Sequence, residues 1–139
     1  MTISMYQASV PVCIRMLNNL AAVLEKAAAY ADARKIDPEV LINDRLYPDM
    51  LTMGRQILIA SDTAKGGVAR LAGVEPPKYE DNEKTFPELI ERLRKTVAYL
   101  NTLKPEQIDG SEKKMITIKV RNDSLTLEGM PYQIGRAHV

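Results

Sequence analysis

Residues 3–34 read ISMYQASVPVCIRMLNNLAAVLEKAAAYADAR, and this stretch decides the fold class. Apolar residues recur along it every three or four positions, which is the spacing of one face of an α-helix. Ser4 is placed to cap the first turn, and the alanines near the far end favour helix. Pro11 lies well inside the pattern, so we expect either a kink or a later start of the helix there.

A second long helix is predicted at residues 48–72, where small and apolar residues again follow the helical period. Asp37 and Pro38 form a start signal for a shorter helix that precedes it and ends at about Asn43. Gly73 suits the position just after a helix end. The following segment, up to Lys84, is therefore predicted to be a loop.

A third long helix is predicted to begin after Thr85, because Thr85 and Glu88 have the spacing of a capping box. Its apolar stripe runs to Leu100. Residues 115–128 change to the alternating pattern of a small β-hairpin. The sequence therefore predicts an all-α protein, an up-down bundle with three long helices present and a hairpin near residues 115–128.

The last six residues, 134–139, depart from the helix that would be expected to begin there. One reverse translation of Ile134–Val139 resembles the start of a common short-read sequencing adapter. We therefore expect residues 134–139 to be a non-native tail and residues 1–133 to be an incomplete bundle domain. Because such bundles usually close with four helices, a missing fourth helix would leave a groove between the first and third long helices.

Charge and composition exclude several partners. The net charge is +1, and it falls to zero without Arg136, which argues against duplex nucleic acid and anionic membranes. Aromatic residues make up 5% of the chain and Trp is absent, so base-stacking platforms are not expected. With a single cysteine and no long apolar stretch, a reducing cytoplasm is the expected location.

Few residues suggest metal or nucleophilic chemistry. The only histidine is His138 and the only cysteine is Cys13, so we expect no metal site and no cofactor within residues 1–133. Cys13 lies on the apolar stripe and is predicted to be a core residue. The acidic residues 80–83 lack the spacing of a calcium loop and are predicted to be a solvated turn. Asp62 and Arg55 are likewise expected on a solvated face.

Three residues are the candidates for a binding site. Tyr6 and Asp49 are expected near the ends of helices that run in opposite directions. Gln56 lies at the flank of an apolar stripe, about 100° from Ile57, and is expected to point into a cleft between helices. These residues could line an interhelical ligand site. The alternative is that they are ordinary surface or packing residues.

Several motifs together carry a family resemblance. They are Met5–Val12, Lys35–Pro38, Pro48–Met50, Gln56–Gly66 and Ile108–Glu112. These stretches resemble bacterial proteins of the DUF1993 family, which is similar in fold to the DinB-like four-helix bundles. The resemblance implies a dimer in the full-length form and a further helix with aromatic and histidine residues, which residues 1–133 do not contain.

The resemblance leaves the function open. The preferred interpretation is a bacterial bundle that binds a small ligand or a partner in an interhelical cleft. The alternative is a DinB-like metal-dependent (thiol) transferase whose ligands lie mainly in the further helix, and no catalytic residue of such an enzyme can be placed on this sequence. A third interpretation is a structural protein without a ligand.

Overall fold

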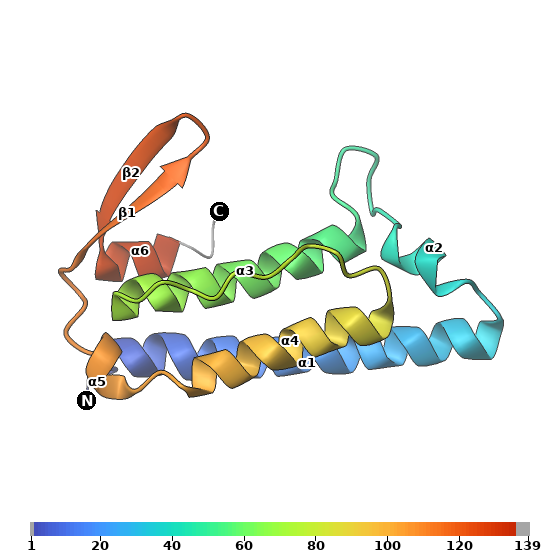
Figure 1. Cartoon of the computed structure of the whole chain (residues 1–139), viewed down its shortest axis with the longest axis horizontal. Coiled ribbons are helices and arrows are strands. Elements are labelled where there is room, and N and C mark those ends of the chain that lie inside the picture. The colour runs from blue at the N-terminus through green and yellow to red at the C-terminus, as the bar shows by residue number, and fades with distance from the viewer. Residues whose placement is uncertain (1, 136–139) are drawn as a thin grey trace.

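The computed structural model describes residues 2–135. Three long helices dominate the structure (Figure 1): α1 (Met5–Arg34), α3 (Met53–Ala72) and α4 (Phe86–Asn101). Three shorter helices are α2 (Pro38–Ile42), α5 (Pro105–Ile108) and α6 (Gly129–Gly135). The strands β1 (Met115–Val120) and β2 (Asp123–Glu128) form an antiparallel hairpin. The predicted mainly helical fold with a small hairpin is confirmed.

Helix α1 begins at Met5 and continues through Pro11. The later start that Pro11 suggested is wrong, because a capping box fixes the beginning of the helix. The Ser4 hydroxyl accepts the N–H of Gln7, and the Gln7 side chain accepts the N–H of Ser4. Asp109, which is 103 positions further along the chain, adds a second cap, because its Oδ1 accepts the N–H of Tyr6 at 2.8 Å.

Helix α3 starts later than the sequence predicted. The expected start at residue 48 is wrong, because the chain turns at Tyr47 and Met50 before the Thr52 hydroxyl caps the helix at the N–H of Arg55. The other predicted helix ends are confirmed. Gly73 ends α3 in the left-handed conformation with a φ of 73°. The capping box at Thr85 opens α4.

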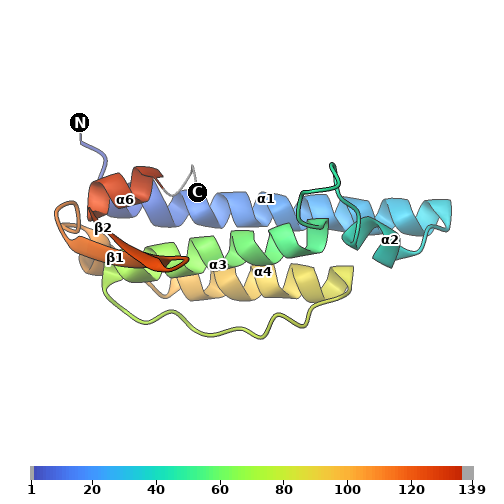
Figure 2. The ribbon, with the colours of Figure 1, turned by 90° about the horizontal axis from the view of Figure 1, so that it is seen from above.

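The long helices do not simply alternate in direction. Helix α1 runs one way, and both α3 and α4 run the other way, so α3 and α4 are parallel (Figures 1 and 2). The predicted up-down order is therefore wrong at this point. Residues 74–85, here called the strap, carry the chain back along α3. Pro76 and Pro77 keep this segment out of helix, and twelve extended residues span about 40 Å, more than the roughly 30 Å of α3.

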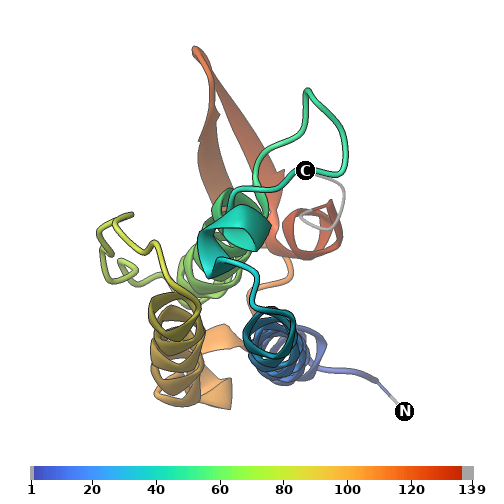
Figure 3. The same ribbon diagram turned by 90° about the vertical axis from the view of Figure 1, so that its right-hand side faces the viewer.

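The core lies between α1, α3 and α4. The most extensive helix packing is between α1 and α4, so the groove expected between the first and third long helices is closed. Leu17 and Leu24 of α1 are buried together with Leu89 and Leu93 of α4. The end-on view in Figure 3 shows α6 at the fourth corner, beside α1 and α3 and away from α4. Helix α6 is short, so it covers that corner at one end only.

Helix α6 begins directly after the hairpin. Gly129 packs so closely against the Ser111 carbonyl that any side chain there would collide with it. The helix includes Ile134 and Gly135, two of the residues predicted to form a non-native tail. These two residues therefore continue an element of the fold. Residues 136–139, the rest of that predicted tail, lie outside the described residues.

Candidate functional site

An apolar groove runs between α1 and α3. Its volume is about 480 Å³, and its walls are mostly apolar side chains. Helix α1 contributes Val12, Cys13, Met16, Leu17 and Leu20, α3 contributes Ala60, Thr63 and Ala64, and α6 contributes Gln133. Val12 is 48% exposed and Met16 is 60% exposed, although both are apolar. A soluble helix normally turns such residues toward a partner element, so their exposure marks an uncovered face.

The α1 wall of this groove changes from buried to exposed along one face. Residues seven apart on a helix point in nearly the same direction. Met5 and Ser9 are fully buried, whereas Val12 and Met16, seven positions further on, are exposed. The change occurs where α6 ends, since Gln133 in α6 donates to the Ala8 carbonyl at 3.1 Å. Among residues 2–135, the face that α6 covers near the start of α1 is therefore left exposed at Val12 and Met16.

The α3 wall is lined by small residues. Ala60 and Ala64 lie one turn apart on it, and both reach the groove. Short side chains leave space above the helix backbone and allow another element to approach closely. The groove thus combines long, exposed side chains on α1 with short side chains on α3.

Cys13 lies at the boundary between groove and core. Its side chain is partly exposed, lines the groove and packs against the buried cluster. The prediction of a core cysteine therefore holds for one side of the residue only. Because Cys13 is the single cysteine of the chain, its thiol is a natural reporter of whether the groove is occupied.

The three candidate residues do not meet in one site. Tyr6 is half-buried at the beginning of α1, at the end of the bundle where α3 finishes. Asp49 is exposed in the loop before α3, and Gln56 lies in the first turn of α3 at the opposite end of the bundle. Gln56 is exposed and donates to the Leu51 carbonyl at 2.8 Å. A binding role for each residue stays a prediction.

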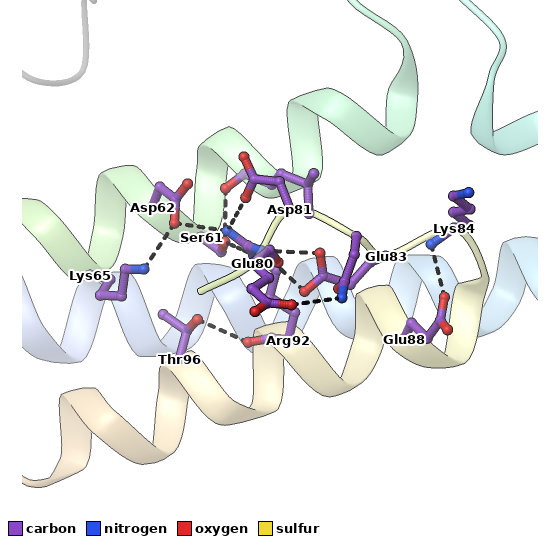
Figure 4. A network of polar contacts seen from close by, with 12 residues as sticks. Ser61, Asp62, Lys65, Glu80, Asp81, Glu83, Lys84, Glu88, Arg92 and Thr96 are labelled. Atoms are coloured by element: carbon purple, nitrogen blue, oxygen red, sulfur yellow. Dashed lines mark hydrogen bonds and ion pairs between the residues drawn. The ribbon is translucent and has the colours of Figure 1, made fainter. Parts of the chain in front are cut away.

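A second notable region is polar and surrounds Arg92 of α4. The Arg92 side chain is only 1% exposed. Its Nε donates to the Ser61 hydroxyl at 2.7 Å, and its Nη2 lies 2.9 Å from the Asp62 carboxylate (Figure 4). Both partners are on α3, so Arg92 ties the parallel α3–α4 pair together. The Asp62 carboxylate also pairs with Lys65 at 3.0 Å.

The strap supplies the remaining partners of Arg92. Nη1 donates to both carboxylate oxygens of Glu83 and to the Glu80 carbonyl, each at 3.1 Å, and Nη2 lies 3.1 Å from Asp81 (Figure 4). Every nitrogen of the guanidinium therefore has an acceptor, which is the condition under which a buried charge is tolerated. The prediction of a solvated turn at residues 80–83 holds for Glu80, Asp81 and Asn82, which are exposed, but Glu83 is half-buried, and the turn also supplies acceptors to a buried cation.

Charge interactions in this region shift two pKa values. A hydrogen bond from Arg55 holds the pKa of Asp81 below its usual value, and the charge of Arg92 acts in the same direction. Burial tends to lower the pKa of Arg92, but the hydrogen bond to Glu83 and the charge of Asp62 raise it above the usual value. Asp62 and Arg55, expected on a solvated face, thus take part in this network.

An aromatic ring of the strap completes the polar region. Lys65 of α3 and Lys95 of α4 lie over the Tyr79 ring, 3.7 and 4.6 Å from its centroid. The Arg92 guanidinium is 5.3 Å from the same centroid. Cations at these distances are attracted by the face of an aromatic ring. Tyr79 therefore fixes the strap to both of the helices that it crosses.

Sequence reasoning missed Arg92, although a signal was present. Arg92 lies three positions after Leu89 and four before Thr96, and both of these residues are fully buried. A cation within an apolar stripe predicts a buried ion pair, and the acidic residues 80–83 are its natural partners. Because the donors of Arg92 are all used within the protein, this region stabilises the fold. The groove is the better candidate for ligand binding.

Comparison with known proteins agrees with this fold. Residues 5–138 match the family described as Domain of unknown function (DUF1993). The chain belongs to the DUF1993 family. It is also similar to a crystal structure of a DinB family member protein from Shewanella denitrificans, with 36% identity and a TM-score of 0.81. That match covers 93% of this chain and 73% of the other, and no curated protein matches the chain.

The family match also bears on the end of the chain. It extends to residue 138, so it gives no support to a non-native tail at residues 134–139. Among residues 2–135, no three His, Cys, Asp or Glu side chains lie together as metal ligands would. Within the same range, no helix has the length and apolar character to cross a membrane. The metal-dependent transferase and the homodimer stay predictions.

Proposed function

We propose that this DUF1993 protein is a binding module whose site is the α1–α3 groove. The observation that carries the proposal is the exposure of Val12 and Met16 on the same face of α1 that buries Met5 and Ser9. An apolar face that is covered at one end and open beyond it is arranged to receive a further apolar element. The site would bind by excluding water from the apolar groove walls.

No catalytic role is assigned to the groove. Its lining is apolar apart from Cys13, Thr63 and Gln133, and it contains no histidine or carboxylate that could act as the base for the Cys13 thiol. The polar region around Arg92 does not compensate, since its charged groups are engaged with one another. Binding is therefore the function that the geometry favours over group transfer.

The test uses an apolar fluorescent probe, anilinonaphthalene sulfonate, on the folded protein. We expect saturable binding of one probe molecule, with a matching decrease in the rate at which Cys13 reacts with a chromogenic disulfide reagent. Met16→Glu should weaken probe binding about tenfold, because a carboxylate placed in an apolar site must lose hydration. Met16 is 60% exposed, so the substitution should leave the fold intact.

Asn18→Glu is the matched control. It adds the same charge to the same helix at an exposed position that does not line the groove. We expect this variant to bind the probe as the wild type does. Equal binding by wild type and Met16→Glu, or probe binding that leaves the Cys13 rate unchanged, would place the probe elsewhere and refute the proposal.

A further inference from the structure

We propose that the strap, residues 74–85, is a displaceable cover over an anion-binding surface of α3 and α4. The ligand is a small molecule with two or more carboxylate or phosphate groups, and carboxylates of the strap occupy their place in the closed structure. Figure 3 shows the strap on the opposite side of α3 from α6. This site is therefore separate from the α1–α3 groove, and it does not rest on the proposed function.

Positive charge is concentrated where the two helices face the strap. Four cations of α3 and α4 contact strap side chains, and they form what is here called the cationic surface: Arg55, Lys65, Arg92 and Lys95. Among residues 2–135, Asp62 is the one helix carboxylate that forms an ion pair with any of them. The two helices alone would therefore present an excess of positive charge, which attracts anions.

The strap contacts the cationic surface through carboxylates. Both carboxylate oxygens of Glu83 lie 3.1 Å from Nη1 of Arg92. Asp81 lies 2.9 Å from Arg55 and 3.1 Å from Nη2 of Arg92 (Figure 4). Guanidinium groups bind carboxylate and phosphate oxygens through the same donors. A free molecule with such groups can therefore make the contacts that Asp81 and Glu83 make in the closed structure.

Side chains, rather than backbone hydrogen bonds, hold the strap in place. Within the described part of the chain, residues 75–84 form no backbone–backbone hydrogen bond, and none of them is fully buried. They are held by the ion pairs of Asp81 and Glu83, by the Tyr79 ring and by the bond from Arg92 to the Glu80 carbonyl. Segments with few internal hydrogen bonds and little burial open at a lower free energy than core helices do. An anion that competes for these cations therefore weakens most of what keeps the strap closed.

Open clefts flank the acidic part of the strap. A cleft of about 680 Å³ on the α4 side is lined by Arg92 and Lys95, among others. A second cleft, of about 450 Å³, is lined by Arg55 and Asp81, among others. Glu83 lines both clefts. Lys95 forms no ion pair within residues 2–135, so a ligand that enters the larger cleft finds a free ammonium group beside the Glu83–Arg92 pair.

The surrounding charge favours a compact ligand. Three glutamates, Glu80, Glu88 and Glu91, also line the larger cleft, and they would repel a long polyanion such as a nucleic acid. A small molecule needs to approach only Lys95 and Arg92. Inorganic pyrophosphate and citrate are suitable probes, because the first carries phosphate groups and the second carries carboxylates.

The experiment measures how fast lysyl endopeptidase cleaves the strap after Lys78 and Lys84, with the fragments identified by mass spectrometry. Pyrophosphate or citrate is added to the folded protein, and sodium chloride of equal ionic strength is the control. At ten times the dissociation constant of the anion for the uncovered surface, strap cleavage should become about tenfold faster, because the uncovered form gains that much in population. The core helices should stay uncut. A short peptide substrate checks that the anion leaves the protease itself unaffected.

A matched pair of variants tests whether the anion and the strap compete. Asp81→Asn removes two of the ion pairs that hold the strap, and Asp81 is exposed, so the fold should be retained. Calorimetric titration should then show about fivefold tighter binding of pyrophosphate, since the uncovered form is more populated. Glu80→Gln removes the same charge from the neighbouring position, where the carboxylate bonds to Asn82 and to no cation among residues 2–135. This control should bind pyrophosphate as the wild type does.

Other outcomes would overturn the inference. Equal acceleration by sodium chloride would mean that salt only screens the ion pairs of the strap. Slower cleavage, or no response to either anion, would mean that the strap is not displaced. Equal tightening in Asp81→Asn and Glu80→Gln would show a general effect of net charge. A response to pyrophosphate alone would assign phosphate groups to the ligand, and a response to citrate alone would assign carboxylates.

Discussion

The two sides of α3 differ in how they are covered by the rest of the chain. On the α4 side the strap closes the helix pair, and the buried Arg92 finds an acceptor for each of its nitrogens. On the α1 side no segment among residues 2–135 covers the groove, and apolar residues such as Met16 are left exposed. The closed side is polar and the open side is apolar. Burying a polar group is costly unless it forms hydrogen bonds within the protein, whereas an apolar face can stay exposed until a partner binds.

The largest loss in the free energy of unfolding should come from a substitution on the closed side. Arg92→Ala leaves Asp62, Asp81 and Glu83 close together without their shared cation, and we expect a loss of about 3–5 kcal/mol in the free energy of unfolding. Arg94→Ala is the control, since Arg94 lies on the same helix but pairs with Glu25 at the surface, where such pairs contribute about 0–1 kcal/mol. Urea unfolding followed by circular dichroism measures both. Similar losses for the two variants would contradict the comparison.

On the open side, substitutions of two adjacent residues of α1 should differ in how much they lower the free energy of unfolding. Leu17 is 4% exposed, and Leu17→Ala should cost about 2–5 kcal/mol because it leaves a cavity in the core. Met16 is 60% exposed, and Met16→Ala should change stability by about 0.5 kcal/mol or less. The same unfolding measurement applies. A large loss for Met16→Ala would mean that the groove is already filled in solution.

A smaller effect is expected from the ring that fixes the strap. Tyr79→Leu keeps an apolar side chain but removes the attraction to Lys65 and Lys95, which should cost about 1 kcal/mol. Tyr30→Leu is the control, because the Tyr30 ring is half-exposed and meets a single cation, Arg34, at 5.6 Å. Proteolysis within the strap should become faster in the first variant only. Unchanged proteolysis of Tyr79→Leu would show that the ring does not hold the strap.

The smallest effect should appear as a pH dependence. Because the pKa of Asp81 is lower in the folded state than its usual 3.8, this carboxylate stabilises the fold above that value. The stabilisation is lost as the pH falls through the lowered pKa. The stability difference between wild type and Asp81→Asn should therefore narrow in urea titrations as the pH falls from neutral to below 3.8. A constant difference would contradict the assigned pairing.

Local chemistry explains which parts of the fold could be predicted. The capping boxes at Ser4 and Thr85 and the glycine at position 73 act within one helical turn, so the sequence alone reveals them. The start of α3 was misplaced because Pro48 suits a turn as well as a helix. The direction of α4 depends on the path of the strap, which helical periodicity does not encode.

The candidate site was harder to predict for a related reason. A search for apolar periodicity treats Arg92 as an interruption, although its position between buried residues is what makes it important. The groove was expected on the wrong side of α1, because the sequence shows that α1 has apolar faces but not which helix covers each of them. Tyr6 and Asp49 were expected near the ends of helices that run in opposite directions, and the start of α1 and the start of α3 do lie at opposite ends of the bundle, so the two residues share no site.

The crossover formed by residues 74–85 also has a consequence for how quickly the chain folds. Helix α1 packs most extensively on α4, an element about 70 positions away in the sequence, and the intervening chain must first pass along α3. Helical proteins fold fast when their contacts join neighbouring helices, and the rate falls as the mean sequence separation of contacts rises. Refolding of this chain should therefore be slower than that of an antiparallel hairpin bundle of equal length and stability.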